Sequence, residues 1–592
     1  MLVIGYGEKP MGRREKRLAR FRRKIGKRWG HAVQLEVRDD VLFLTGLVPE
    51  WLAKVALGHG AGKLGFRGVV NDIQVSGVSE PSMSLPLEND NSLEGKRYDV
   101  VIIGGGVIGC AVARELSRKN LKIGVLEKES DLAMQASGRN DGMIHPGFAP
   151  HPGTRKAHYN VRGNQMYDQW SQELGFSLKR PGSIVLFRSW FSIFLVPLIR
   201  LRCSLNGVAG KYKYLSPRAV RAMEPHVSAQ QRGGFFLPSA GIVSPFDVTL
   251  ALAENAVENG VDFHLETAVM AMEMSHQQIQ GLQTNRGCIE AKVVVNAAGV
   301  WADVVAQMAD DRFFSLHGRK GTDAILDKET GARQTRIMAM PPLVRRKSIQ
   351  TKGGGIVPCV EGNLLLGPTA QEVPDREDYS TDAGEFSHLV RQLDLNSRLS
   401  ASQIINYYSG VRAASWDEDF IIEPSQKVKN LVHAAAIQSP GLASAPAIGA
   451  DVAAMAVQAL ERCGYGVEER ENFQPYHHAQ VPVKDLPEEE RSALIAKDST
   501  YGEILCRCEE VSRGEVRDAL RSLVPALTVD GVKRRTRSGA GRCHGGFCLS
   551  RVMKVMAEEM GVPLTQIRKK DGQSQILVGE TKGGVSPSGR AS

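Results

Sequence analysis

Four cysteines near the C-terminus have the residue type and the spacing of a metal centre. They form the pattern Cys506-x-Cys508 and, after 34 residues, Cys543-x4-Cys548. Four thiolates can hold zinc or a [2Fe–2S] cluster. Zinc ribbons favour C-x2-C pairs, so this spacing favours the cluster, while zinc and a metal-free set of thiols remain as alternatives.

A glycine-rich turn between an apolar strand and a helix is the second chemical signature. Gly104, Gly106 and Gly109 form G-x-G-x-x-G after the buried-strand pattern 100–103, and helical periodicity follows over 107–116. We expect Gly104 to permit a tight turn, Gly106 to let the backbone approach a pyrophosphate, and Gly109 to bring the helix against the strand. The N-terminus of the helix would then offer free N–H groups to the phosphates.

Glu127 completes this nucleotide-binding pattern. It follows the predicted strand 121–126 and lies 18 residues after Gly109. A carboxylate at that place accepts hydrogen bonds from ribose hydroxyls and disfavours a 2′-phosphate, which argues against NADP. The pattern predicts a dinucleotide site, but it does not distinguish FAD from NAD.

Three downstream motifs carry a resemblance to a known family. They are SGRNDGMIHPG over 137–147, VVVNAAGVWA over 293–302 and IQSPGLASAPAIGADVA over 437–453. In this order they resemble the D-amino-acid-oxidase-like FAD oxidoreductases, and the resemblance covers roughly residues 97–578. Within that superfamily the chain looks most like the large subunit of anaerobic glycerol-3-phosphate dehydrogenase and like L-2-hydroxyglutarate dehydrogenase.

The resemblance implies FAD as a cofactor and a set of positions that contact it. The ADP half is expected at Gly104, Gly106, Gly109 and Glu127, and the adenine at the backbone of Val269. The remaining positions approach the flavin, the pyrophosphate, the ribitol and the ring edge, and they are Ser137, Gly138, Arg139, Gly142, Ala298, Gly299, Trp301, Gly441 and Leu442.

On the substrate side the resemblance implies four candidate residues. His145 is a candidate base, while Arg412, with Arg319 or Lys320, is expected to hold an anionic group through bidentate hydrogen bonds. Each assignment has an alternative in which the residue has only a structural role. In these alternatives His145 is a buried structural histidine, and Arg319 and Lys320 are surface charges. Arg412 would form an ion pair with one of the acids at 417 and 418.

The segments around the cysteines carry a second resemblance. They read LCRCEEVS and TRSGAGRCHGGFC, and they resemble the bacterioferritin-associated-ferredoxin-type domain found at the end of these dehydrogenase subunits. This implies a [2Fe–2S] cluster. Backbone N–H groups would reach the cluster sulfurs at the glycines of the second segment, Gly539, Gly541, Gly545 and Gly546.

Composition divides the chain into segments of different character. They are a basic arm (1–30), a module of strand and helix patterns (31–77), a linker (78–96), an oxidoreductase block with interleaved FAD-binding and substrate subdomains (97–463), a second linker (464–500), a cysteine domain (501–578) and a disordered tail (579–592). The module resembles a BON-type domain, which is usually an interaction or membrane-adjacent domain. The predicted fold class is α/β: a Rossmann-type FAD-binding domain with a mixed-sheet substrate domain, a small α+β N-terminal module and a small C-terminal [2Fe–2S] domain.

Charge and apolar clusters bear on location. The net charge is +10, and residues 13–28 hold ten Lys or Arg against one acid. The arm is interpreted as solvated and partly disordered, with binding of anionic lipid as an alternative and nucleic acid an unlikely partner. The longest apolar cluster, 190–199, is too short to span a membrane and is predicted to be a partly buried helix, with a membrane- or partner-facing patch as an alternative. With no secretory pattern, we expect a cytoplasmic protein. Peripheral contact with the inner face of the membrane remains an alternative.

The two expected cofactors, FAD and a [2Fe–2S] cluster, indicate the type of activity. A flavin takes two electrons as a hydride and an iron–sulfur cluster takes one at a time, so both together predict a dehydrogenase. We expect oxidation of a small anionic hydroxy compound, first of all glycerol 3-phosphate, with electrons leaving for a partner subunit, a ferredoxin or a quinone-linked acceptor. In many relatives Glu and Tyr stand where this chain has Thr322 and Asp323, which leaves the substrate open. The alternatives are a 2-hydroxy acid or amino/imino acid dehydrogenase and a non-catalytic electron-transfer or assembly subunit.

Overall fold

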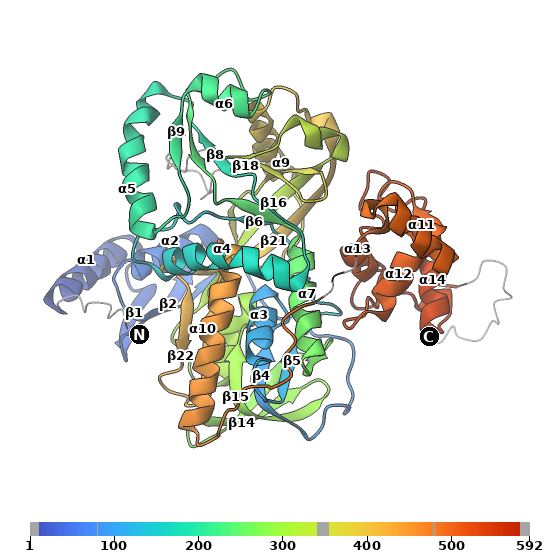
Figure 1. Ribbon diagram of the computed structural model, residues 1–592. Helices are drawn as coiled ribbons and strands as arrows, with labels where there is room; N and C mark the ends of the chain where they lie inside the picture. The colour runs from blue at the N-terminus through green and yellow to red at the C-terminus, as the bar shows by residue number, and fades with distance from the viewer. Residues whose placement is uncertain (1–10, 80, 340–353, 478, 480, 580–592) are drawn as a thin grey trace, which may run out of the picture.

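Two large β-sheets form the body of the protein in the computed structural model, which describes residues 11–79, 81–339, 354–477, 479 and 481–579. The N-terminal module lies at one side of this body and the C-terminal domain at the opposite side (Figure 1). Apart from Gly579, the tail expected to be disordered lies outside the described residues, as do the first ten residues of the basic arm.

The first sheet has eight strands and carries the glycine-rich turn. Its parallel core runs in the order β12 (Val261–His264), β5 (Ile123–Leu126), β4 (Lys96–Ile103), β15 (Gly287–Asn296) and β23 (Leu431–Ala435). Three antiparallel strands extend it: β14 (Gln278–Thr284), β13 (Val269–Ser275) and β22 (Ile421–Pro424). Buried on both faces, the parallel strands are continuous apolar runs, as predicted for 100–103.

Four helices pack beside this sheet: α3 (Val107–Leu116), α4 (Arg155–Leu174), α7 (Pro245–Glu258) and α10 (Gly441–Arg462). Among the described residues, α10 alone has the length and apolar composition of a membrane-crossing helix, which sequence analysis had not anticipated. Most of it is buried against α3 and α4, and a Cβ on Gly449 would lie 2.8 Å from that of Ala111. Small residues therefore make α10 a close-packed core helix.

The second sheet confirms the mixed-sheet prediction. Its strands run β20 (Gln371–Val373), β16 (Leu316–Leu326), β19 (Leu364–Gly367), β18 (Gly355–Pro358), β17 (Ile337–Ala339), β8 (Ser183–Leu186), β10 (Gly234–Leu237) and β9 (Lys213–Leu215). β21 (Ile404–Ser415) pairs antiparallel with β16 along its whole length, whereas β17 and β8 are parallel. A separate three-stranded sheet contains β6 (Met143–Ile144), which belongs to the flavin motif, with β11 (Gly241–Val243) and β7 (Leu178–Lys179).

The N-terminal module has the strands and helix predicted for 31–77: β1 (Val33–Arg38), β2 (Val41–Val48), α2 (Trp51–Gly62) and β3 (Gly68–Val75). The basic arm differs from its prediction, because residues 11–29 form helix α1 rather than disordered chain. Leu18, Phe21, Ile25 and Trp29 are spaced three or four residues apart and pack on the module. The charges of the arm concealed this apolar stripe.

The module is packed on the oxidoreductase body rather than tethered to it. On α2, a Cβ at Gly58 would lie 2.1 Å from the ring of Trp416, and one at Gly62 would lie 2.2 Å from its carbonyl oxygen. The Arg67 guanidinium pairs with Glu423 at 3.0 Å. Two helical glycines thus allow α2 to touch the loop that follows β21.

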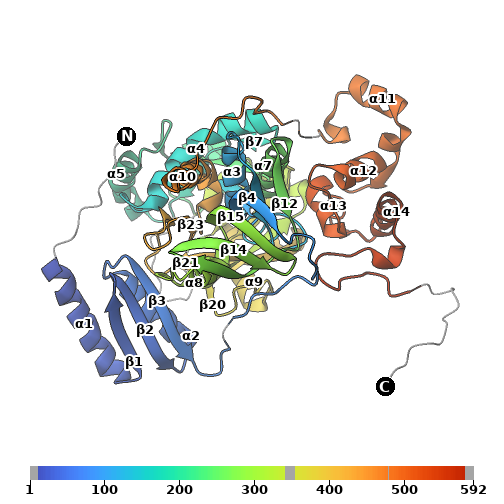
Figure 2. The same cartoon turned by 90° about the horizontal axis from the view of Figure 1, so that it is seen from below.

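Both predicted linkers are ordered where described. Residue Leu93 of the first is buried, and the Arg286 guanidinium pairs with Asp90. The second runs along the body, where Arg470 donates to the carbonyl of Ser117, and then ends in helix α11 (Glu488–Lys497). The small C-terminal domain follows with β24 (Ile504–Cys506), β25 (Val511–Ser512), α12 (Arg513–Arg521), α13 (Val529–Thr536) and α14 (Leu549–Met560) (Figure 2).

The apolar cluster 190–199 is helical and in part buried, as expected, but its aromatic side chains are far more exposed than that expectation implies. It forms a 3₁₀ turn, η1 (Trp190–Leu195), and the start of helix α5 (Val196–Asn206). Phe191 and Phe194 are each 79% exposed. Val196 and Ile199 pack on the buried cluster around Phe187, and the Arg232 guanidinium lies over the Trp190 ring at 5.6 Å, but Phe191 and Phe194 are left uncovered by the described chain.

We expect substitution of Gly58 by Leu to weaken the docking of the module. The new side chain would meet the buried Trp416 ring, and such overpacking costs about 1–3 kcal/mol. Urea unfolding and the rate of proteolysis in the segment 78–92 would measure the effect. Gly26→Leu is the matched control, because it also lies in a helix but has open space around it. Equal midpoints and equal proteolysis for the two variants would contradict the docking contact.

Candidate functional site

A cavity of about 610 Å³ opens where the carboxyl ends of the parallel strands meet the second sheet. In an open α/β sheet this edge is where ligands bind. Most of the positions predicted to hold FAD line it: Gly104, Gly106, Glu127, Ser137, Arg139, Val269, Ala298, Gly299, Trp301, Gly441 and Leu442. The sequence motifs, far apart in the chain, therefore meet at one place.

The glycine-rich turn has the geometry that its residues predicted. Gly104 has a φ of +111°, and a Cβ there would lie 2.5 Å from the carbonyl oxygen of Ala297. Gly109 lies outside the cavity wall, where its Cβ would meet the Gly104 oxygen at 1.9 Å, so its role is close packing. The first turn of α3 faces the cavity, and the Val107 N–H donates to Ser137 Oγ at 2.9 Å.

The Glu127 carboxylate lies in the wall beside this turn. It accepts hydrogen bonds from the backbone N–H groups of Gly105 at 2.7 Å and Glu129 at 2.9 Å. Burial and the nearby Glu129 charge raise its pKa to about 7. Each carboxylate oxygen keeps a further lone pair, so ribose hydroxyls can still donate to it.

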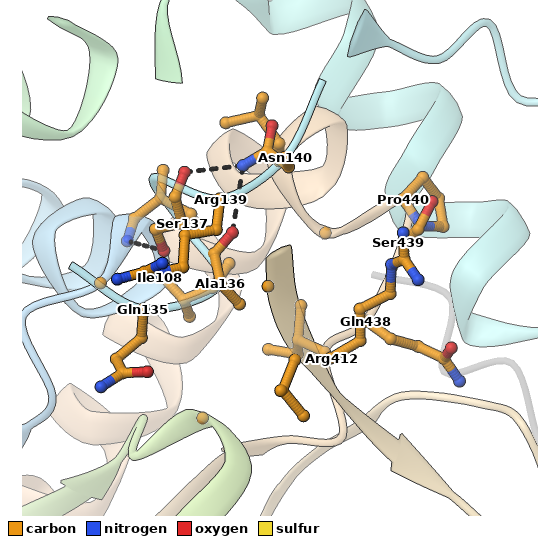
Figure 3. A pocket seen from close by; sticks show the side chains of 18 of the residues that line it. Ile108, Gln135, Ala136, Ser137, Arg139, Asn140, Arg412, Gln438, Ser439 and Pro440 are labelled. Atoms are coloured by element: carbon orange, nitrogen blue, oxygen red, sulfur yellow. Dashed lines mark hydrogen bonds between the residues drawn. The ribbon is translucent and has the colours of Figure 1, made fainter. Parts of the chain in front are cut away.

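The segment 137–142 wraps one end of the cavity (Figure 3). Asn140 Nδ2 donates to the carbonyls of Ala136 and Ser137, which fixes the loop. The Arg139 guanidinium lies over the Tyr379 ring at 4.2 Å. Gly138 and Gly142, predicted to lie near the flavin, do not line the cavity. Their absent side chains make room for Phe246 and for the carbonyl of Val243, respectively.

Arg412 and His145 both line the cavity, as predicted for the substrate side. Arg412 Nη1 donates to the Thr369 carbonyl at 3.3 Å, and a Cβ at Gly321 would lie 2.3 Å from its guanidinium. None of the carboxylates in the described chain lies within ion-pair distance of Arg412, so the alternative ion pair is not formed. His145 is half-buried, and the side chains of Asn160 and Asn164 donate to its carbonyl oxygen.

Arg319 and Lys320 are neither cavity ligands nor surface charges. Both are buried in β16, whose residues are covered on both faces. Lys320 pairs with Asp378 at 2.8 Å, and Arg319 pairs with Glu372 at 2.6 Å and with Glu418 at 2.5 Å. Their burial contradicts the surface-charge alternative, and both side chains form ion pairs outside the cavity lining.

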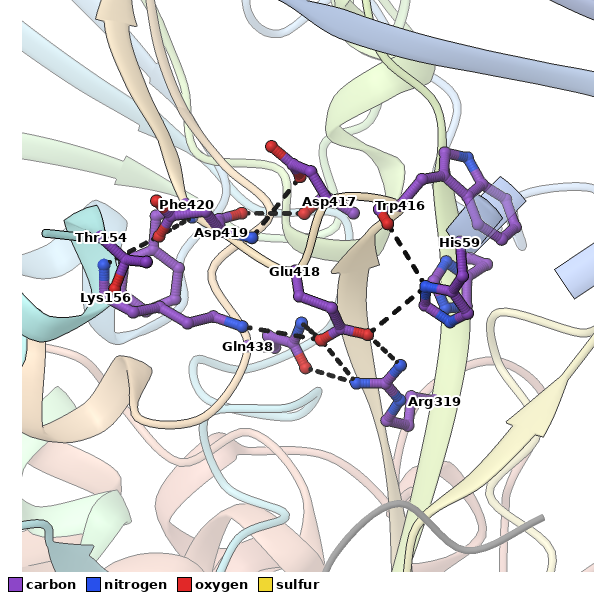
Figure 4. A network of polar contacts seen from close by, with 12 residues as sticks. His59, Thr154, Lys156, Arg319, Trp416, Asp417, Glu418, Asp419, Phe420 and Gln438 are labelled. Carbon is purple, nitrogen blue, oxygen red and sulfur yellow. Dashed lines mark hydrogen bonds and ion pairs between the residues drawn. The ribbon is translucent and has the colours of Figure 1, made fainter. Parts of the chain in front are cut away.

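A polar network at the cavity wall includes two residues, Lys156 and His59, that the sequence analysis did not identify (Figure 4). Glu418 lines the cavity, pairs with Arg319 and lies 3.8 Å from Lys156 Nζ, which also lines it. Burial opposes ionisation of Glu418, but the Arg319 guanidinium outweighs it and holds the pKa of Glu418 well below its usual range. His59 of the N-terminal module reaches the same carboxylate at 3.7 Å. The available signal was the position of Lys156 in the segment HPGTRKAHYN (151–160), which closely follows the flavin motif 137–147.

The four C-terminal cysteines lie together, as their spacing predicted. The Sγ atoms of Cys508 and Cys543 are 3.3 Å apart, while Cys506 and Cys548 are buried. The Cys548 thiol, with backbone N–H groups of Gly539 and Glu509, lowers the pKa of Cys506 to about 5. A set of clustered thiols in which one readily ionises fits a metal cluster.

The cysteine domain docks against the loop that follows Glu127. Asp131 is buried and receives the guanidinium groups of Arg534 at 2.7 Å and Arg535 at 2.8 Å, both on α13. Next to Cys508, Glu509 is paired with Lys328 in the 3₁₀ turn η3 (Lys328–Arg333), which follows β16. Ion pairs to the segments that follow β5 and β16 thus hold the cysteine domain to the body.

The sequence pattern described as "FAD dependent oxidoreductase" matches residues 99–455, which is more than half of the chain. The chain belongs to this FAD dependent oxidoreductase family. A second pattern, described as "BFD-like [2Fe-2S] binding domain", matches residues 504–558. This FAD dependent oxidoreductase is therefore a two-cofactor protein, and its cysteine set agrees with the cluster rather than with zinc.

The protein is similar in sequence or structure to three known relatives. It is 38% identical to the glycerol 3-phosphate dehydrogenase of Caloramator mitchellensis over 82% of this chain and 100% of the relative. It is 24% identical to the anaerobic glycerol-3-phosphate dehydrogenase subunit A1 of Haloferax volcanii over 78% of this chain and 83% of the relative. The FAD-bound L-alpha-glycerophosphate oxidase of Mycoplasma pneumoniae aligns with a TM-score of 0.60 and 25% identity over 65% of this chain and 100% of that one.

The affinity of the apoprotein for FAD is expected to depend on the charge of Glu127. Ribose hydroxyls donate to the ionised carboxylate, whereas a pKa of about 7 keeps much of it protonated below neutral pH. Binding must then release a proton, so FAD should bind about tenfold more tightly at pH 8 than at pH 6. Fluorescence titration of the apoprotein measures this. Glu127→Gln should bind weakly at both values, while Glu224→Gln, a buried glutamate outside the cavity, should keep the dependence. A pH-independent affinity in the native protein would rule out this assignment.

Cys506→Ser is expected to remove the iron–sulfur absorption and leave the flavin bands. A hydroxyl is a poor ligand for iron, while the FAD cavity shares no residue with the cysteine set. The visible spectrum and the iron and sulfide content of anaerobically purified protein would show this. Cys463→Ser, outside the set, serves as the control. Zinc instead of iron in the native protein would contradict the cluster.

Proposed function

We propose that the protein oxidises glycerol 3-phosphate and passes the electrons through its [2Fe–2S] cluster to an acceptor protein. The observation that carries the proposal is Arg412, a cation in the cavity wall with no carboxylate partner among the described residues. The name of the Caloramator mitchellensis relative, which matches over its full length, supports this choice of substrate.

An anionic substrate compensates an electrostatic cost in the cavity. Burial disfavours the charged form of Arg412 and lowers its pKa, and the carboxylates of Asp323 and Asp141 act on it only from a distance. A phosphate accepts two parallel N–H bonds from a guanidinium, so a bound phosphate would satisfy this charge. Lys156 lines the same cavity, but its ammonium is paired with Glu418 at 3.8 Å, so Arg412 is the cation that the proposal assigns to the phosphate.

The protein residues then position the substrate and move its proton. FAD, when bound, supplies the hydride acceptor for the H–C–OH group. We infer that Arg412 anchors the phosphate, and that His145 takes the hydroxyl proton as a general base. Asn160 and Asn164 fix the backbone of His145, which limits the motion of its ring relative to the cavity.

The docking of the cysteine domain supports onward electron transfer. Asp131 lies four residues after Glu127, in the loop that follows β5. Its ion pairs with Arg534 and Arg535 hold the cysteine domain to that loop. The Haloferax volcanii relative is called a subunit, which agrees with an acceptor on a partner chain. We therefore favour a partner subunit or a ferredoxin as the acceptor.

Anaerobic reduction of the bound flavin by glycerol 3-phosphate tests the proposal. Loss of a charged hydrogen-bonding group costs about 10- to 150-fold, so Arg412→Ala should lower kcat/KM with a dye acceptor by this factor. Arg462→Ala, at the exposed end of α10, should leave it unchanged.

Two outcomes would replace the proposal. Reduction by L-2-hydroxyglutarate or an amino acid but not by glycerol 3-phosphate would favour a hydroxy or amino acid dehydrogenase. A flavin that no small substrate reduces, but that exchanges electrons with a partner protein, would favour an electron-transfer subunit.

A further inference from the structure

Helix α5 and the 3₁₀ turn η1 before it present an exposed apolar ridge. Its large side chains recur every three or four residues, so they share one face. They are exposed by between 55% and 79%, and they are Trp190, Phe191, Phe194, Leu198, Leu201 and Leu205. Soluble proteins seldom leave six such side chains uncovered on one element. We call these six residues the α5 ridge.

The chain around the α5 ridge carries charge of one sign only. From Leu174 to Met223 there is no Asp or Glu. The same stretch contains nine basic residues: Lys179, Arg180, Arg188, Arg200, Arg202, Lys211, Lys213, Arg218 and Arg221. Arg188 and Arg200, which border the ridge directly, are both exposed. An anionic surface would therefore attract this face and meet no repelling carboxylate from this stretch.

We propose that the α5 ridge inserts into the interface of an anionic phospholipid bilayer. A helix with Trp, Phe and Leu on one face and arginines at its borders is typical of interfacial membrane binding. Trp and Phe suit the headgroup boundary, while the arginines pair with lipid phosphates. A protein partner would more often complement the basic border with its own acids around a flatter, polar-rimmed patch.

Helix α1 adds a second basic surface on the same side of the molecule. Both views show α1 and α5 at the same edge, opposite the C-terminal domain (Figures 1 and 2). The apolar stripe of α1 is packed on the module, so its exposed residues are mainly basic, among them Arg20, Arg23 and Lys27. Because its apolar face is already covered, α1 can add attraction to anionic lipid but little insertion.

The ridge is tied to the wall of the cavity. Asn206, at the end of α5, donates to the carbonyls of Gly147 at 2.8 Å and Pro150 at 3.0 Å. Arg202 Nε donates to the same Pro150 oxygen at 3.2 Å. The segment 147–151 lines the cavity, so binding of α5 to a bilayer would place this edge of the substrate cavity beside the membrane.

Co-sedimentation of the full-length holoprotein with vesicles tests the insertion. Vesicles of phosphatidylcholine with phosphatidylglycerol should bind it far better than phosphatidylcholine alone. Phe191→Ser/Phe194→Ser should weaken binding by at least about tenfold, since two large apolar groups no longer leave water. Leu85→Ser/Leu87→Ser is the matched control, because these residues are also exposed but lie in the segment 78–96.

The electrostatic part is tested separately. Arg188→Gln/Arg200→Gln should weaken binding by about fivefold per residue and reduce its dependence on salt. The variant Arg20→Gln/Arg23→Gln measures how much the basic residues of α1 contribute to vesicle binding. All variants should keep their FAD content and their activity with a soluble dye, since none of these residues lines the cavity. That result distinguishes a failure of membrane binding from a failure of the fold or of the proposed activity.

Fluorescence of Trp190 reports the depth of insertion. Brominated lipids should quench part of the emission, and Trp190→Phe should remove that part. Absence of binding by the native protein would overturn the proposal, as would equal binding by Phe191→Ser/Phe194→Ser. A dimer, found by light scattering, that the serine variant abolishes would assign the ridge to a second copy of the chain and would also overturn it.

Discussion

The close approach of α3 to the turn after β4 is the constraint on which the nucleotide site depends. A side chain at Gly109 would overlap the Gly104 carbonyl oxygen, and one at Gly104 would overlap the backbone at Ala297. The helix therefore begins directly at the carboxyl end of the parallel strands, with its first turn facing the cavity. α10 packs on α3 where Gly449 meets Ala111. Because Gly441 begins α10, its place in the cavity wall also depends on the position of α3.

Charge compensation decides which cations can bind a ligand. Arg319, in β16, is neutralised by Glu372 and Glu418, whereas Arg412, directly opposite in β21, has no carboxylate within ion-pair distance in the described chain. The two arginines are cross-strand neighbours and differ only in their surroundings. A partly buried cation without a carboxylate partner marks a binding position, because its desolvation must be offset by a ligand.

The sequence predicted what is encoded locally. Glycine spacing, apolar strand runs and cysteine spacing each depend on a short stretch of chain, and these predictions were confirmed. The burial and the ion pairs of Arg319 were not predicted, because a strand covered on both faces shows no alternation that would reveal the environment of its charges. His59 meets Glu418 across 359 positions in sequence, and no local pattern records such a contact. The exposure of Phe191 was likewise misjudged, since an apolar run does not tell whether another element covers it.

The arrangement of the end domains constrains the route of the electrons. The cysteine domain lies on the side of the body opposite α1 and α5 (Figure 1). If the α5 ridge rests on a bilayer, the cluster faces away from it, and a quinone within that bilayer would have to be reached through the body of the protein. Asp131 and its two arginines hold the cysteine domain in this position. On the proposed membrane orientation, an acceptor protein would dock to the cysteine domain from the aqueous side, and the edge of the cavity at 147–151 would lie beside the bilayer.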